Sequence, residues 1–174
     1  MKTYWTITGS VFKIGLFVVL LGAIQSCRSR KPQSESVEWG EIEKKLGINV
    51  SKQSDLPFYK EVVKWLGTPY KFGGSTPKGT DCSGFVTTVY EVVFKQKLPR
   101  QSAQQFKSAK STTAKKLEAG DLYFFDISGK GVSHVGMHLA DDYFIHASTK
   151  KGVIVSSLKE TYYSKSFVGF GTFR

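Results

Sequence analysis

The sequence predicts an α+β fold in which N-terminal helices pack on a C-terminal antiparallel β-sheet. Apolar residues recur at helical spacing in the first part of the chain, up to about residue 110. The period then changes, and short segments rich in aromatic and β-branched residues follow, each bounded by Gly, Asp or Ser. Helices first and strands second indicate this fold class. The 174 residues suggest one folded domain behind an N-terminal extension.

Three helices are expected. Residues 56–66 carry apolar side chains at 58, 62, 63, 65 and 66, and Gly67-Thr68-Pro69 ends the helix. A second apolar stripe runs through residues 81–95, and residues 101–110 form a third, shorter helix. Residues 70–80 hold three glycines and a proline and are expected to form a loop. The expected strands are residues 121–126, 134–139, 143–147, 152–156 and 167–173.

Residues 1–26 are typical of a secretory signal peptide. Lys2 and Lys13 precede an apolar run over residues 14–24, which ends at Ser26. The run is too short to span a bilayer comfortably as a permanent helix. An uncleaved signal anchor is the alternative interpretation.

Cys27 follows this segment directly, and Ile24-Gln25-Ser26-Cys27 resembles the lipobox of bacterial lipoproteins. Two or more acyl chains on this residue would give stable membrane anchoring. The alternative is an ordinary thiol within the signal segment. We therefore expect residues 27–50 to comprise the lipidated cysteine and a tether, polar from Arg28 to about Trp39, and residues 51–174 to form the folded domain. The expected location is the cell envelope, on the outer membrane facing the periplasm.

The chain is basic, with a formal net charge of +11. Removing the two lysines of the signal segment leaves +9, which favours anionic partners. Nucleic acid is not expected behind a secretion signal, and the scattered lysines indicate that much of this charge is solvated surface. The chain has two cysteines. If Cys27 carries lipid, Cys82 has no disulfide partner, which in an exported protein indicates either burial or catalysis.

Cys82 is expected at the first turn of a helix, delivered there by a glycine-rich loop. Backbone N–H groups in a first turn are unsatisfied and carry partial positive charge, which stabilises a thiolate nucleophile. Thr80 or Asp81 could cap the helix through a side-chain oxygen. The alternative is a buried structural cysteine, a common role for a free thiol.

A thiolate nucleophile needs a proton acceptor, usually a histidine, and all three histidines lie in the strand region. His134 and His138 share one strand face, and the apolar residues between them share the other. A three-residue loop at residues 140–142 would set Leu139 opposite Tyr143 and bring His146 to the face that carries His134; a two-residue loop would place His146 on the opposite face. Periodicity alone leaves both His134 and His138 open as the base.

Several motifs, taken together and in order, resemble the NlpC/P60 family of cysteine peptidases. The match extends over about residues 58–173, and Leu98-Pro99-Arg100 before Ala103-Gln104-Gln105 is also similar. Many family members carry Trp where this chain has Phe72, a departure expected to alter groove shape more than chemistry. The motifs are Tyr70, Asp81-Cys82-Ser83-Gly84-Phe85, Gly120-Asp121-Leu122, Ser133-His134-Val135-Gly136-Met137 and Ile145-His146-Ala147-Ser148.

The resemblance implies a role for each matching residue. Cys82 is the nucleophile, His134 the general base and His146 the polar third residue of a Cys-His-His triad. Tyr70 supports the oxyanion or substrate, with packing of a loop aromatic as the alternative. Asp81 and Ser83 contact the substrate's amine or backbone, with helix capping as the alternative, and Ser133 joins this substrate-binding group.

The resemblance also implies a papain-like enzyme that hydrolyses peptidoglycan stem peptides. The bond cut is either the γ-D-glutamyl–diamino-acid bond or the D-alanyl–diamino-acid cross-link. No cofactor is expected, and no Cys/His cluster has zinc-ligand spacing. The expected oligomeric state is a monomer. An amidase or acyltransferase of the same fold and a non-catalytic wall-binding lipoprotein are the alternatives.

Overall fold

The computed structural model describes residues 1–2, 33–50 and 55–174. The expected signal peptide and lipidation site Cys27 lie outside these residues. The chain divides into two units, Met1–Lys31 and Pro32–Arg174, and every described helix and strand belongs to the second. None of the helices in the described part of the chain is both long and apolar enough to cross a membrane.

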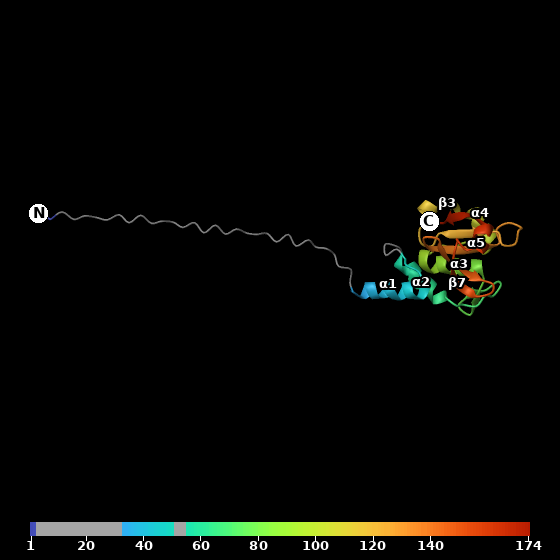
Figure 1. Cartoon of the computed structure of the whole chain (residues 1–174), viewed down its shortest axis with the longest axis horizontal. Coiled ribbons are helices and arrows are strands. Elements are labelled where there is room, and N and C mark those ends of the chain that lie inside the picture. The colour runs from blue at the N-terminus through green and yellow to red at the C-terminus, as the bar shows by residue number, and fades with distance from the viewer. Residues whose placement is uncertain (3–32, 51–54) are drawn as a thin grey trace. The chain divides into compact units, whose positions relative to one another are not determined.

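Helices precede the main sheet in the second unit (Figure 1), as the sequence predicts. The first helices are α1 (Gln33–Leu46), α2 (Leu56–Trp65), α3 (Cys82–Val89) and α4 (Ser102–Ser108), with a π-helical turn, η1 (Tyr90–Phe94), directly after α3. A small hairpin, β1 (Ser75–Thr76) and β2 (Gly79–Thr80), lies between α2 and α3. Further short helices are η2 (Ala114–Lys116) and α5 (Thr161–Ser166).

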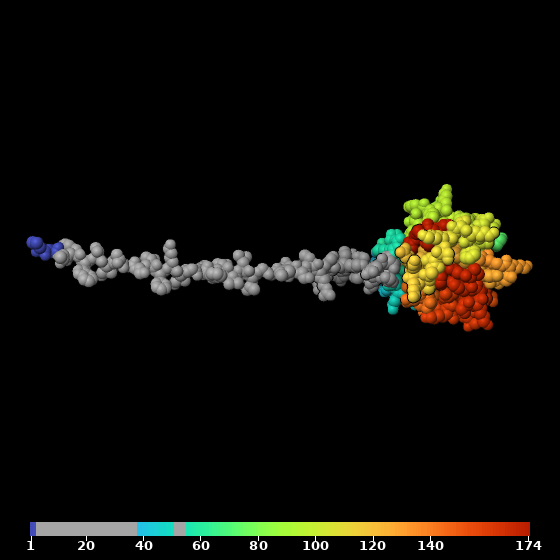
Figure 2. Space-filling model, turned by 90° about the horizontal axis from the view of Figure 1, so that it is seen from above, coloured from blue at the N-terminus to red at the C-terminus, as the bar shows by residue number. Residues whose placement is uncertain are grey.

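The main sheet has six strands, all paired antiparallel, which confirms the predicted α+β class. Its spatial order is β3-β8-β4-β5-β6-β7. In the space-filling view the yellow segment around β3 lies against the red C-terminal segment, because β3 pairs with β8 at this edge (Figure 2). The strands are β3 (Lys110–Thr112), β4 (Leu122–Phe125), β5 (His134–Ala140), β6 (Tyr143–Ser148), β7 (Gly152–Ser157) and β8 (Phe167–Thr172).

The two faces of the sheet bury different sets of side chains, as strand alternation requires. One face packs against α2 and α3 and joins the main core, to which β5 contributes Val135, Met137 and Leu139. The other face forms a smaller aromatic cluster, Tyr123, Phe125, Phe144 and Tyr163. The histidines of β5 and β6 lie on this second face, since they alternate with the core residues.

The register between β5 and β6 brings His146 to the face that carries His134, although the loop between the strands has two residues, Asp141 and Asp142, and not the expected three. Met137 pairs with Ile145, the register that sets Gly136 opposite His146. Ala140, and not Leu139, pairs with Tyr143. The bulge between His138 and Ala140 takes up the extra residue, so the two-residue loop does not turn His146 to the opposite face. His134 and His146 therefore share a face, and a Cβ added to Gly136 would lie 3.1 Å from the His146 Cβ atom.

The folded unit begins earlier than the expected boundary at residue 51. Residues 33–46 of the segment assigned to the tether form α1, which packs on α2. Trp39, Ile42, Leu46 and Val50 are buried in the main core. In the sequence, the charged residues of α1 hide this stripe of apolar positions at helical spacing.

The remaining differences from the predicted elements are local. The helix expected over residues 81–95 widens into the π-helical turn after Val89. That turn buries Tyr90, whose hydroxyl donates to the Gly120 carbonyl at 2.8 Å. The loop expected over residues 70–80 contains the two-residue strands β1 and β2, and β3 and α5 were not predicted. Such short elements carry too few residues to show a period.

Candidate active site

A tight loop delivers Cys82 to the start of α3. Asp81 is the N-cap residue, with extended backbone, and its Oδ1 accepts the Gly84 N–H at 2.7 Å. The Gly74 carbonyl approaches this turn so closely that a Cβ added to Gly84 would lie 2.1 Å from its oxygen. Only glycine permits this contact. The predicted placement of Cys82 in a first helical turn is therefore confirmed, and the cap is Asp81.

Cys82 is a buried free thiol. Burial raises its pKa, and the Asp81 charge acts in the same direction. Backbone N–H groups of Val135, Ser83 and Cys82 itself lower it, but burial outweighs them. The helix start therefore acts on the thiol in the predicted direction without making it a resting thiolate. A proton acceptor is needed before the sulfur can attack.

His134 and His146 form a hydrogen-bonded pair. His134 Nε2 lies 2.9 Å from His146 Nδ1, and the two rings are nearly perpendicular, at 87°. Both side chains are buried, and burial lowers the pKa of His134 to about 4. Burial and then His134 lower the pKa of His146 well below its ordinary value. Both imidazoles are thus neutral near pH 7, the form in which a histidine accepts a proton.

Cys82 lies between two cavities. The smaller, of about 250 Å³, is lined by Cys82, His134 and His146 together with Tyr163 of α5. The larger, of about 570 Å³, extends toward Asp81 and Ser83. Cys82, Tyr70 and Ser133 line both. The structure thus gathers the predicted site residues of the folded unit around one sulfur atom, with space on either side for an extended ligand.

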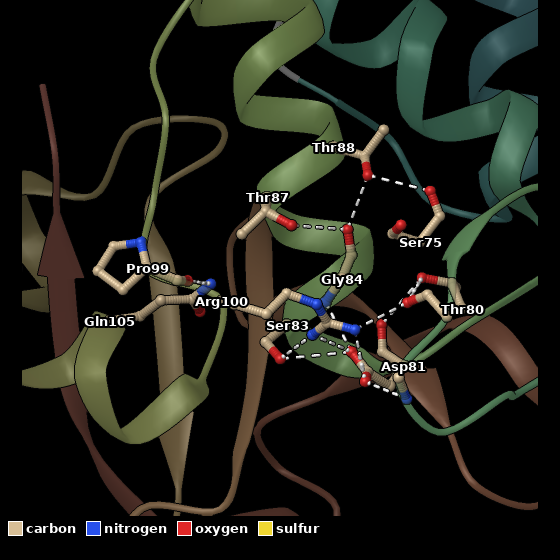
Figure 3. A network of polar contacts seen from close by, with 12 residues as sticks. Ser75, Thr80, Asp81, Ser83, Gly84, Thr87, Thr88, Pro99, Arg100 and Gln105 are labelled. Carbon is tan, nitrogen blue, oxygen red and sulfur yellow. Dashed lines mark hydrogen bonds and ion pairs between the residues drawn. The ribbon is translucent and has the colours of Figure 1, made fainter.

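Asp81 is held by Arg100 as well as by the helix it caps (Figure 3). The guanidinium of Arg100 donates to both carboxylate oxygens at 2.8 Å, to Ser83 Oγ at 2.9 Å and to the Gly74 carbonyl at 3.1 Å. The Gly73 N–H also donates to Asp81 Oδ2 at 2.8 Å. Burial would raise the Asp81 pKa, but the Arg100 and backbone hydrogen bonds lower it overall. The Asp81 carboxylate is therefore ionised and is held by Arg100 and by backbone N–H groups.

Tyr70 and Ser133 sit on the rims of the two cavities. Burial raises the pKa of the Tyr70 hydroxyl, and a charge on Cys82 raises it further. Tyr70 lines both cavities together with Cys82. Ser133 Oγ accepts the backbone N–H groups of Ile127 and Ser128, at 3.0 and 3.1 Å. Ser133 thereby shapes the β4–β5 loop beside the smaller cavity.

Sequence reasoning missed three residues that support the site. Arg100 lay in a segment similar to the family, but nothing in the sequence linked it to Asp81. Ser156 and Tyr163 both contact His146 Nε2, at 3.3 and 3.1 Å. No local pattern could have revealed them, because β7 and α5 meet β6 only in the folded chain. No group of three or more His, Cys, Asp or Glu among the described residues is arranged to hold a metal ion.

Comparison with known proteins identifies similar chains. Murein DD-endopeptidase MepS/Murein LD-carboxypeptidase of Escherichia coli (strain K12) is 43% identical over 107 residues, which cover 62% of this chain and 56% of that protein. Gamma-DL-glutamyl hydrolase of Bacillus subtilis (strain 168) is 36% identical over 122 residues, covering 69% of this chain and 30% of that protein. The chain thus aligns with little more than half of the first relative and less than a third of the second.

The fold comparison agrees. The crystal structure of an NlpC/P60 family protein from Bacillus cereus ATCC 10987 superposes with a TM-score of 0.62 at 31% identity, covering 67% of this chain and 39% of that one. Residues 67–172 match the model of the NlpC/P60 family, and this range contains Cys82 and all three histidines. Sequence, fold and the arrangement around Cys82 agree, and the chain belongs to the NlpC/P60 family.

Proposed function

We propose that the protein is a cysteine peptidase that hydrolyses peptidoglycan stem peptides through Cys82, His134 and His146. The observation that carries this proposal is the cavity that Cys82 and a neutral, hydrogen-bonded histidine, His134, line together. A buried thiol with a raised pKa is a poor nucleophile until a base removes its proton. His134 is that base, and its hydrogen bond with His146 keeps its ring in place.

The first half-reaction forms an acyl-enzyme. His134 Nε2 is engaged with His146, which leaves Nδ1 to take the thiol proton. The Cys82 sulfur then attacks the substrate carbonyl carbon. The first-turn N–H groups and the Tyr70 hydroxyl stabilise the resulting oxyanion. Collapse of this intermediate breaks the C–N bond as His134 returns the proton to the leaving amine.

The second half-reaction hydrolyses the acyl-enzyme. His134, again neutral, accepts a proton from a water molecule that attacks the thioester carbon. The C–S bond breaks, and the proton on His134 restores the Cys82 thiol. His146 acts in both steps by orienting His134 and stabilising its cationic form. Asp81 and Ser83 stay predicted substrate contacts, in addition to their bonds with Arg100.

The substrate class follows from the relatives and the shape of the site. One relative is named a murein DD-endopeptidase and another a gamma-DL-glutamyl hydrolase, which supports a D-alanyl cross-link or a γ-glutamyl bond as the bond that this chain cuts. Cavities on both sides of Cys82 suit an extended peptide. Hydrolysis of either the D-alanyl–diamino-acid or the γ-D-glutamyl–diamino-acid bond is therefore proposed.

Digestion of defined stem peptides, followed by mass spectrometry, tests the proposal. One substrate carries the γ-D-glutamyl bond and the other the D-alanyl cross-link. We expect wild-type protein to cleave one or both, and Cys82→Ala to abolish cleavage with an unchanged circular dichroism spectrum. Cleavage by Cys82→Ala at close to the wild-type rate would show that the nucleophile is wrong.

The same digestion separates the alternatives. Products cut beside the sugar would identify an amidase, and products joined to an added amine would identify an acyltransferase. A non-catalytic wall-binding protein would release nothing, and its thiol would label slowly with iodoacetamide at neutral pH.

We further propose that Cys27 anchors the protein through lipid in the cell envelope, on the outer membrane facing the periplasm. The support is the lipobox-like sequence ending at Cys27, after an apolar segment typical of a signal peptide. Such an anchor would hold a monomeric enzyme next to its polymeric substrate. The measurement is incorporation of a labelled fatty acid, with membrane fractionation. Wild-type protein should be labelled and membrane-bound, and Cys27→Ala should be unlabelled; an unlabelled wild type would refute lipidation.

A further inference from the structure

The outer nitrogen of His146 meets two hydroxyl groups. Its Nε2 lies 3.1 Å from the Tyr163 hydroxyl and 3.3 Å from Ser156 Oγ. Tyr163 comes from α5 and Ser156 from β7, the strand that pairs with β6. His146 is 1% exposed, so solvent cannot replace these partners. Neither residue belongs to the motifs on which the family resemblance rests.

The order of hydrogen bonds determines where each ring carries its proton. His134 can accept the Cys82 proton at Nδ1 only if its own proton sits on Nε2. That N–H must then donate to His146 Nδ1, 2.9 Å away, which forces the His146 proton onto Nε2. A buried N–H needs an acceptor. The Tyr163 and Ser156 oxygens are the acceptors within reach among the described residues.

The surroundings of Tyr163 suit this role. Its ring packs against the His146 ring with centroids 5.1 Å apart, and against Phe125 and Phe144 at 5.6 and 5.1 Å. Burial raises the pKa of the Tyr163 hydroxyl, and a hydrogen bond with Ser156 acts in the opposite direction. The phenol oxygen is therefore held in place beside His146 Nε2.

We propose that Tyr163 and Ser156 are positioning residues that select the tautomer of the His134–His146 pair. By accepting the His146 Nε2 proton, their oxygens keep Nδ1 of His146 unprotonated and so keep Nδ1 of His134 free to act as a base. Without them the pair would populate the opposite arrangement, in which His134 carries its proton on Nδ1 and cannot deprotonate Cys82. This inference rests on the proposed function, since it explains how the proposed base is kept competent.

The test combines kinetics with ¹⁵N NMR of histidine-labelled protein, which reports the protonated ring nitrogen directly. The variants are Tyr163→Phe, Ser156→Ala and the double variant. Tyr163→Phe keeps the ring and removes only the hydroxyl. Tyr123→Phe is the matched control, because it removes the hydroxyl that contacts His138 Nδ1 at 2.9 Å on the same sheet face.

We expect each single variant to lose roughly tenfold in kcat/KM, because the other hydroxyl still accepts, as loss of one group that orients a histidine does at metal sites. The double variant should approach the roughly 10⁴-fold loss known for a wrong tautomer in a triad. Its His146 signal should move from the Nε2-protonated to the Nδ1-protonated pattern, while Tyr123→Phe changes neither rate nor His146 signal.

A double variant that keeps the wild-type tautomer would overturn the proposal, whatever its rate. So would a tautomer change with an unchanged rate. If the double variant does not fold, Tyr163→Phe alone decides, since its His146 signal should already show a mixture. A wild-type protein that cleaves no stem peptide would contradict the proposed function instead, and the tautomer measurement would still test the hydrogen-bond chain.

Discussion

Two histidines on one face of β5 have nearly the same local environment. His134 and His138 are each 7% exposed, and burial lowers the pKa of each to about 4. Each ring has one nitrogen 2.9 Å from a side-chain partner, His146 for the first and Tyr123 for the second. Neither burial nor pKa distinguishes them.

His134 and His138 differ in the cavity that each side chain lines. His134 shares a cavity with the Cys82 thiol. His138 lines a larger cavity, of about 690 Å³, to which no cysteine contributes among the described residues, and its ring stacks on Tyr123 at 5.7 Å. A depressed histidine pKa is therefore a property of this sheet face. His134 is the candidate base because it shares a cavity with Cys82, the proposed nucleophile at the start of α3.

The largest effect should come from His134→Ala. We expect a loss in kcat/KM as great as that of Cys82→Ala, because the residues of a nucleophilic unit are strongly non-additive and single losses reach on the order of 10⁴ to 10⁶. The measurement is kcat/KM on one defined stem peptide for both single variants and for the double variant, which should be no slower. A comparison in which His138→Phe is the most damaging substitution would reverse the assignment of the base.

Substitution of His146 should have a graded effect. In His146→Asn the amide oxygen can still accept the His134 Nε2–H, so we expect roughly a tenfold to hundredfold loss in kcat/KM, as for other residues that orient a histidine. His146→Ala removes the acceptor and should cost more. Both variants are compared at equal folded fraction. Equal and total loss in the two would show that His146 does more than orient His134.

His138→Phe should have the smallest effect on activity, within about threefold, because the ring contacts no reacting group. Tyr123→Phe is combined with His138→Phe so that no buried hydroxyl is left without its partner.

The effect of replacing His138 should instead appear in the pH dependence of stability. The folded pKa of His138, about 4, lies below its ordinary value of 6.5. The unfolded chain therefore binds a proton first as pH falls, and stability is lost between pH 6.5 and 4.

Thermal unfolding midpoints across this pH range measure that contribution. The wild type should lose stability steeply because His134, His138 and His146 all have lowered pKa values. The His138→Phe/Tyr123→Phe variant lacks one of the three and should lose less. Parallel curves for the two proteins would contradict the lowered pKa of His138. The pKa of His134 is tested separately by the acid limb of the kcat/KM profile, whose midpoint is expected well below pH 6.5.

Much of the fold and the core of the site could be predicted because they depend on local patterns. Periodicity separated helices from strands, and the glycine-rich segment before Cys82 placed it at a helix start, confirmed at α3. Strand alternation put His134 and His138 on one face. The register expected for a three-residue loop brings His146 to the same face, but the loop has two residues, and a β-bulge that was not predicted keeps this register.

Only the tertiary structure decided which of these elements meet. The period of a strand shows the direction of a side chain but not what lies opposite, so it could not choose between His134 and His138. Arg100 reaches Asp81 across 19 positions, and Tyr163 reaches His146 across 17. Contacts at such separations arise from the packing of whole elements. The sequence by itself thus determined the kinds of groups at the site, and the fold decided their hydrogen-bond partners.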